Sequence, residues 1–370
     1  MSHAVPVFCS APCYSCRIKC SVSMSQPTYP GPLELAHPHE VWIIQPPRRR
    51  LWIHIVLLLA TFLSTTMVGS RIAFNFEHRQ PAFCMSDGCP PLFALSALRH
   101  PSELLPGLPF SLTLMFILLA HEMGHYLYAR HYRVYATLPY FVPFLSLIGT
   151  LGAFIRIKSP IPSRAALFDI GIGGPIAGFI PACIALLVGV ARSRPGLVSD
   201  IPRAQLGFPL IFGLAARLLR VPGPVSGLCL HPIAVAAWVG LFATALNLLP
   251  GGQLDGGHIL FSVWPRQHRL VSALTVLALV LLGYYFWSGW LLWAVILAMT
   301  SRHPAVPAYP AVSGGRRWVA LFGVLMLFLT FTRDPITPYP RSDGWSDLRQ
   351  EVRQDIQWLR YEIHHLLQRK

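Results

Sequence analysis

Three ionisable residues stand together inside a long apolar run. The run extends from Phe110 to Arg130 and contains the sequence H-E-M-G-H at positions 121–125. An apolar segment of this length is typical of a membrane-spanning helix, where ionisable side chains are rare unless they are paired and functional. On a helix, His121 and His125 lie one turn apart on the same face, so their imidazoles can share one metal ion. Glu122 lies beside them, close enough to take a proton from a metal-bound water.

The alternative is a chance H-E-x-x-H pattern on a soluble helix. Burying these groups in an apolar run without a metal would cost several kcal/mol each, so the sequence favours a metal site. Asp255 is the only acidic residue at the edge of a second apolar run, and its glycine neighbours let the backbone approach another helix. Arginines follow both runs, which predicts that Asp255 and His125 lie at the same membrane face.

This set of side chains predicts an open zinc site with three ligands, His121, His125 and Asp255, and one Zn²⁺ per chain. Structural zinc sites are usually closed and rich in cysteine, whereas an open position favours catalysis, with Glu122 as the general base. Asp169 is a second candidate ligand, although its place before a helical run favours an N-cap. Three functions remain open: a peptidase, a transporter or proton pathway, and an inactive relative that only binds substrate.

The motifs together resemble the site-2 proteases, which are intramembrane zinc metallopeptidases. The resemblance covers residues 108–264 and rests on H-E-M-G-H, on the Gly-Pro element at 174–178, and on the N-x-x-P-x-x-x-L-D-G pattern at 247–256. It implies zinc held by the three ligands, cleavage of transmembrane protein substrates, and Asn247 near the scissile peptide or its oxyanion. It also implies that residues 140–157 form a membrane hairpin that pairs with unwound substrate. PDZ and CBS domains, which many relatives carry, have no room here, as in a bacterial type without them.

The composition independently predicts an integral membrane protein. Of 370 residues, 54% are hydrophobic and only 12% are charged, and the mean hydropathy is +0.50. Soluble domains usually carry about 25% charged residues. The excess of 30 Lys and Arg over 15 Asp and Glu favours loops held in the cytoplasm and contacts with anionic lipids over nucleic-acid binding. We expect a bacterial plasma membrane, with the active site toward the cytoplasm; the sequence predicts no oligomeric state.

The expected fold is an all-α polytopic membrane protein with about six or seven transmembrane helices and a re-entrant or β-hairpin segment. Apolar runs place the spans at 51–68, 110–130, 169–190, 231–249, twice within 270–300 with a break near 288–289, and at 318–331. The expected domains are a disordered leader (1–47), a first span with its outer loop (48–107), the catalytic core (108–264), additional spans (265–332) and an amphipathic C-terminal helix (333–370).

Several cysteines and both chain ends lead to weaker expectations. Four cysteines fall within residues 1–23, where a translation-start artefact with Met24 as the true start, or disorder, is favoured over a metal knuckle. Cys84 and Cys89 form a disulfide or stay free, and the sequence does not choose between these states. Residues 352–366 repeat apolar side chains at helical spacing, which suits either a short coiled coil or packing on a membrane surface.

Overall fold

The computed structural model describes residues 50–83, 101–144, 147–196, 203–301, 303–304 and 306–339. Met1–Arg50 and Leu51–Lys370 are separate units, and the description below concerns the second of them. The expectations for the leader, for Cys84 and Cys89, and for the amphipathic repeat at 352–366 lie outside the described residues.

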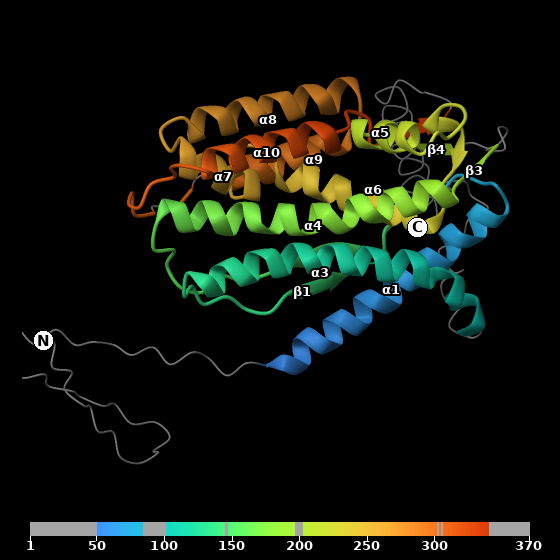
Figure 1. Ribbon diagram of the computed structural model, residues 1–370, viewed down its shortest axis with the longest axis horizontal. Helices are drawn as coiled ribbons and strands as arrows, with labels where there is room; N and C mark the ends of the chain where they lie inside the picture. The colour runs from blue at the N-terminus through green and yellow to red at the C-terminus, as the bar shows by residue number, and fades with distance from the viewer. Residues whose placement is uncertain are drawn as a thin grey trace, which may run out of the picture. The chain divides into compact units, whose positions relative to one another are not determined.

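The described part of the chain is mostly helical. Its helices are α1 (Leu51–Glu77), η1 (Pro101–Gly107), α3 (Leu108–His131), α4 (Arg164–Arg192), α5 (Leu210–Leu218), η2 (Val225–Gly227), α6 (Pro232–Asn247), α7 (Asp255–Val263), α8 (His268–Tyr285), α9 (Gly289–Met299) and α10 (Arg316–Thr330), as Figure 1 shows. Four segments are long and apolar enough to cross a membrane: α1, η1 with α3, α4, and α8. Shorter apolar helices, α6 and α9, accompany them. The protein is therefore an integral membrane protein, and the expected total of six or seven spans stays a prediction.

Two helices extend beyond the ranges expected from the sequence. The first span was expected to end at Val68, but α1 continues to Glu77 because its polar residues are covered by the rest of the fold. The third span begins at Arg164, where Ser163 Oγ accepts a hydrogen bond from the Ala166 N–H and caps the helix. The N-cap expected at Asp169 is therefore wrong, because Asp169 lies in the second turn of α4.

Helices α3, α4 and α6 run side by side and form the central packing layer (Figure 1). Small residues allow this closeness. A Cβ on Gly189 of α4 would lie 2.3 Å from the Ala234 nitrogen of α6, and a Cβ on Gly240 of α6 would lie 2.7 Å from Ile117 of α3. Large apolar side chains, Trp238 among them, fill the rest of this layer. The three helices are thus held in fixed register around the polar groups of α3.

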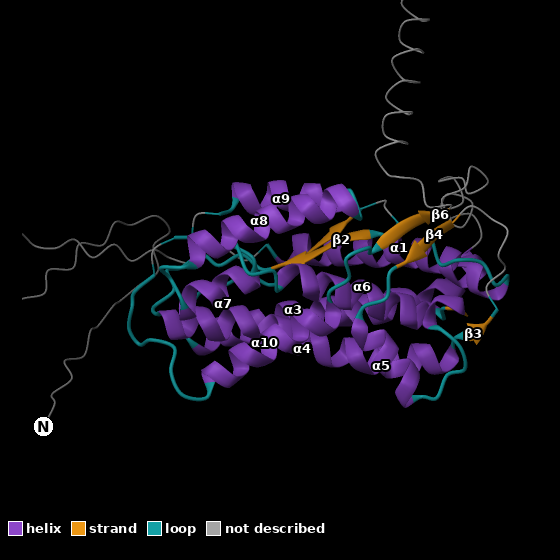
Figure 2. Cartoon of the chain, turned by 90° about the horizontal axis from the view of Figure 1, so that it is seen from above, coloured by secondary structure: helices purple, strands orange, loops and turns teal. Residues whose placement is uncertain are grey.

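A β-hairpin lies between α1 and α3. Strands β1 (Tyr140–Pro143) and β2 (Thr150–Phe154) pair antiparallel, with Tyr140 opposite Phe154, and Figure 2 shows the strands in orange among the helices. Helix α1 contacts this hairpin chiefly through β1, whereas α3 contacts it through β2. The expected hairpin at 140–157 is therefore confirmed, and its depth in the membrane stays a prediction.

Two further strand pairs lie near the C-terminal end of α4. Strands β3 (Arg194–Pro195) and β5 (Leu228–Cys229) pair with each other, and β4 (Arg203–Leu206) pairs with β6 (Ile336–Tyr339). β3, β4 and β5 belong to the connection between α4 and α6, whereas β6 follows α10. The end of α10 is therefore tied to the same end of the molecule as the end of α4.

Candidate metal and catalytic site

Helix α3 carries the H-E-x-x-H residues at a depth where they are buried by protein. His121, Glu122 and His125 are 6%, 6% and 7% exposed. The helix ends about two turns later at His131. Two residues further on, Arg133 takes a left-handed backbone conformation with φ of 56°. The depth of the two histidines in the membrane stays a prediction.

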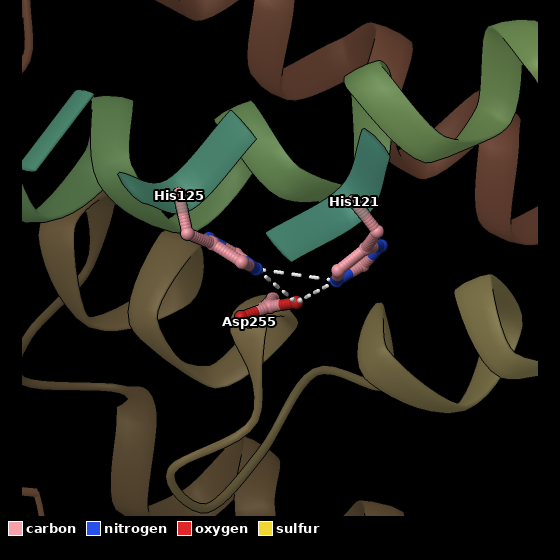
Figure 3. Close-up of side chains that lie close together, drawn as sticks. All are labelled: His121, His125 and Asp255. Carbon is pink, nitrogen blue, oxygen red and sulfur yellow. Dashed lines mark hydrogen bonds and ion pairs between the residues drawn. The ribbon is translucent and has the colours of Figure 1, made fainter. Parts of the chain in front are cut away.

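Three side-chain atoms meet at one point between α3 and α7. His121 Nε2 and His125 Nε2 each lie 3.3 Å from Asp255 Oδ2, and the two nitrogens lie 3.2 Å apart (Figure 3). Four-coordinate zinc with Zn–N and Zn–O bonds of about 2.0–2.1 Å holds its ligand atoms about 3.3 Å apart. The triangle therefore fits one face of a zinc tetrahedron. Among the described residues, this is the group of His, Cys, Asp and Glu side chains that meets the geometry of a metal site.

A tight backbone return places Asp255 in this triangle. The carboxylate belongs to the first turn of α7, and the chain reaches it from the end of α6 through a short turn. A Cβ on Gly256 would lie 2.2 Å from the Leu248 carbonyl oxygen, and one on Gly257 would lie 2.4 Å from the Gly251 oxygen. Only glycine allows the backbone to approach itself so closely, which explains the Asp-Gly-Gly sequence.

The carbonyl of Ile170 orients one of the two imidazoles. His125 Nδ1 lies 2.7 Å from this oxygen, which belongs to the second turn of α4. A carbonyl can only accept a hydrogen bond, so the proton of a neutral imidazole is held on Nδ1 and the lone pair of Nε2 points into the triangle. This contact was not foreseen, because a backbone acceptor has no sequence signal of its own.

Glycines of α4 provide the space for both imidazoles. A Cβ on Gly174 would lie 2.1 Å from His125 Nε2, and one on Gly178 would lie 2.9 Å from His121 Cβ. The four-residue spacing of the two glycines matches that of the two histidines. The sequence indicated close helix packing here, and this shared spacing is the signal that would have assigned the glycines to the imidazoles.

Glu122 lies outside the ligand triangle and contacts the hairpin. Its carboxylate lies next to the backbone of Ile155, the residue that directly follows β2. A carboxylate that is buried beside a metal site but is not a ligand is suited to proton transfer. The contact also links the proposed base to the hairpin edge.

Asn247, at the last turn of α6, comes close to the same triangle. Its Nδ2 lies 3.2 Å from His121 Nε2. Asp169, the second candidate ligand, lies elsewhere, where it forms an ion pair with Arg316 and accepts a hydrogen bond from the Tyr132 hydroxyl. The structure thus brings together His121, Glu122, His125, Asn247 and Asp255, and leaves Asp169 outside.

Comparisons with known proteins match the part of the chain that carries this site. Residues 109–287 match the family described as Peptidase family M50. The chain is 32% identical over 253 residues to the probable chloroplastic zinc metalloprotease EGY2 of Arabidopsis thaliana, covering 66% of this chain and 44% of that protein. It is 28% identical over 328 residues to the probable chloroplastic zinc metalloprotease EGY1 of the same plant, covering 84% of this chain and 57% of that protein.

A rice relative gives the same result, and the chain spans about half the length of these curated relatives. The probable chloroplastic zinc metalloprotease EGY1 of Oryza sativa subsp. japonica is 30% identical over 304 residues, covering 78% of this chain and 51% of that protein. These relatives are chloroplast proteins by name and give no support to the bacterial plasma membrane or bacterial type expected from the sequence. Together with the geometry, they identify His121, His125 and Asp255 as a zinc-binding site.

Proposed function

We propose that this chain, whose residues 109–287 match peptidase family M50 and include the three zinc ligands, hydrolyses peptide bonds in or near transmembrane helices of protein substrates. One observation supports the proposal: two of the three zinc ligands, together with Glu122, lie on a helix that is itself long and apolar enough to cross a membrane. A substrate must therefore reach the site within the bilayer or at its border. We also propose that the substrate is itself a membrane-spanning protein and that its cleavage serves regulated proteolysis.

The residues divide the chemical work among them. Zinc, when bound, supplies a Lewis acid that polarises the scissile carbonyl and makes water a stronger acid. The Glu122 carboxylate accepts the proton of the attacking water and delivers it to the nitrogen of the leaving amine. Asn247 offers an amide N–H near the triangle, in reach of the oxygen on which negative charge develops. The protein around these groups limits the access of other water, because His121, Glu122 and His125 are all buried.

The hairpin supplies what an unwound substrate needs. A helix in lipid cannot expose a carbonyl to attack without leaving backbone groups unpaired, at several kcal/mol each. Helix α1 covers the β1 side of the hairpin, whereas the β2 side contacts α3 and ends next to Glu122. We therefore propose that substrate adds as a strand along β2, which pairs its backbone groups and brings it to the base.

The exchange Glu122→Gln tests the function directly. The variant keeps the three zinc ligands and loses the proton acceptor, so we expect about one zinc per chain and no cleavage of fluorescently tagged single-span membrane peptides in proteoliposomes. His125→Ala and Asp255→Ala should lose both zinc and cleavage. A wild-type protein that binds zinc but cleaves no peptide in the panel, and accumulates none in Glu122→Gln cells, would be an inactive binding relative. Zinc-independent ion flux across the same liposomes would instead favour the transporter.

A further inference from the structure

Three polar side chains form a network at the end of the helices that lies beyond His125. Arg316 donates to both carboxylate oxygens of Asp169, from Nε to Oδ1 at 2.8 Å and from Nη2 to Oδ2 at 2.7 Å. The Tyr132 hydroxyl donates to Asp169 Oδ2 and accepts from Arg316 Nη2 at 3.2 Å. The three residues come from the end of α3, the second turn of α4 and the first residue of α10.

This network adjoins the contact that orients a zinc ligand. Asp169 directly precedes Ile170, whose carbonyl oxygen lies 2.7 Å from His125 Nδ1. Tyr132 follows His125 by seven residues, or two helical turns, so both face α4 from the same side of α3. Helices α3 and α4 are therefore joined at two consecutive points, once through the imidazole and once through the network.

The network is a partly buried ion pair with two contact points, and not a solvent-exposed pair with one. The Asp169 side chain is 15% exposed and the Arg316 side chain is 35% exposed. A bidentate Arg–carboxylate contact fixes orientation as well as distance, which a lysine ammonium cannot do. Arg316 lies beyond residues 109–287, the part of the chain matched to the peptidase family.

We propose that Tyr132, Asp169 and Arg316 are positioning residues, and that they hold the turn of α4 whose Ile170 carbonyl orients His125. Helix α10 thereby supports zinc binding from outside the matched region, through α4 and without touching the metal ligands. The inference rests on the zinc site within the proposed function, and it concerns zinc affinity rather than peptide hydrolysis. It can therefore be tested whether or not a substrate is known.

The test compares zinc affinity in Arg316→Gln, Arg316→Lys and Arg317→Gln. The purified full-length proteins are titrated with a chromophoric zinc chelator, and both the affinity and the rate of zinc release are measured. Arg317 is the matched control because it is exposed, adjacent in sequence and loses the same charge on substitution. Circular dichroism is measured first and should give the same helix content for all three variants and the wild type.

We expect Arg316→Gln to bind zinc about tenfold more weakly, at the low end of the 10–100-fold losses seen when groups that orient metal ligands are removed. Arg316→Lys should fall between Arg316→Gln and wild type, because it keeps the charge but not the two-point contact. Arg317→Gln should match wild type. Asp169→Asn should weaken zinc binding similarly, and adding it to Arg316→Gln should change little more, since both break one network.

Met326→Ala separates positioning from general support by α10. Met326 is fully buried in α10, away from the network, so its truncation lowers the unfolding temperature and should leave zinc affinity unchanged. If Arg316→Gln and Arg317→Gln bind zinc as tightly as wild type, the proposal is overturned. It is also overturned if Met326→Ala loses zinc affinity as much as Arg316→Gln does. Tyr132→Phe, which removes a single hydroxyl, repeats the test should Arg316→Gln fail to fold.

Discussion

At the scale of single residues, Gly174 and the His125 ring occupy a space that has no room for a methyl group. A Cβ at Gly174 would lie 2.1 Å from Nε2, the nitrogen that binds zinc. We expect Gly174→Ala to lose zinc and to lower stability by about 1–3 kcal/mol, the usual cost of overpacking. Zinc content and thermal unfolding in detergent measure both effects. Gly213→Ala is the control, because it lies in α5 with open space around it, and it should keep zinc and stability.

Asn247 presents a different case, because its present partner is a zinc ligand. When zinc occupies the lone pair of His121 Nε2, Asn247 Nδ2 can no longer donate to that nitrogen and becomes available to a substrate oxygen. We expect Asn247→Ala to keep one zinc per chain and to lower kcat by about 10²–10³-fold, as for the loss of one oxyanion donor. Parallel measurements of zinc content and peptide cleavage decide this. Loss of zinc would show that Asn247 instead supports His121.

These residues also show what the sequence can predict. H-E-x-x-H and Asp255 were predictable, because their side-chain chemistry appears in the letters and the arginines after each run placed them at one depth. The Ile170 carbonyl was not, since every residue carries one and only the fold selects it. Asp169 was misassigned for a related reason: an aspartate near a helix start commonly caps it, and its partner Arg316 is remote in sequence.

At the scale of elements, α1 holds the hairpin at both of its ends. His54 Nδ1 lies 3.0 Å from the Pro139 oxygen beside β1, and Ser64 Oγ donates to the Gly149 oxygen at 2.6 Å beside β2. Gly149 has a φ of 85° and lies so close to α1 that a Cβ would approach the Ser64 oxygen to 2.8 Å. The tip of the hairpin therefore has one position on α1, and β2 is held next to Glu122.

Gly149→Ala tests whether this docking matters for cleavage. We expect it to move the tip away from α1 and to reduce cleavage while zinc stays bound, because the zinc ligands lie on α3 and α7. Gly223→Ala is the matched control: its φ of 81° brings similar backbone strain, but it lies outside the hairpin and no atom lies within 4 Å of the added Cβ. Cleavage and zinc content are compared for the two variants. An equal loss of cleavage would point to backbone strain rather than to the contact with α1.

The sequence predicted elements well where apolar runs stood alone. The break near Ser288–Gly289 was correct, since α8 ends at Tyr285 and α9 begins at Gly289. The end of α1 was missed, because its last turns carry polar residues that are buried by contacts with distant segments. Hydropathy measures the preference of residues for lipid. It therefore does not detect helical turns whose polar residues are buried by other parts of the protein.

At the scale of the whole membrane unit, the structure establishes which residues share an end of the helices. Tyr132, Asp169 and Arg316 join one end, and β4 pairs with β6 at the other. Arginines occur at both ends of the helices. The distribution of arginines alone therefore does not determine which end faces which compartment. The depth shared by Asp255 and His125 no longer depends on that rule, because their side chains lie 3.3 Å apart.

The arrangement predicts that α10 crosses the membrane and that its two ends face opposite compartments. α10 has 15 residues, or about 22 Å at 1.5 Å per residue, which is shorter than the roughly 30 Å hydrocarbon core, so the bilayer must thin locally or flanking residues must complete the span. Single cysteines at Arg317 and Arg333, both exposed, are labelled with a membrane-impermeant maleimide in a variant without native cysteines. We expect Arg317→Cys to react only from the side of His125, and Arg333→Cys only from the opposite side, together with Arg194→Cys. If Arg317→Cys and Arg333→Cys react from the same side, α10 does not span the bilayer, and the β4–β6 pair lies on the same membrane face as the metal site.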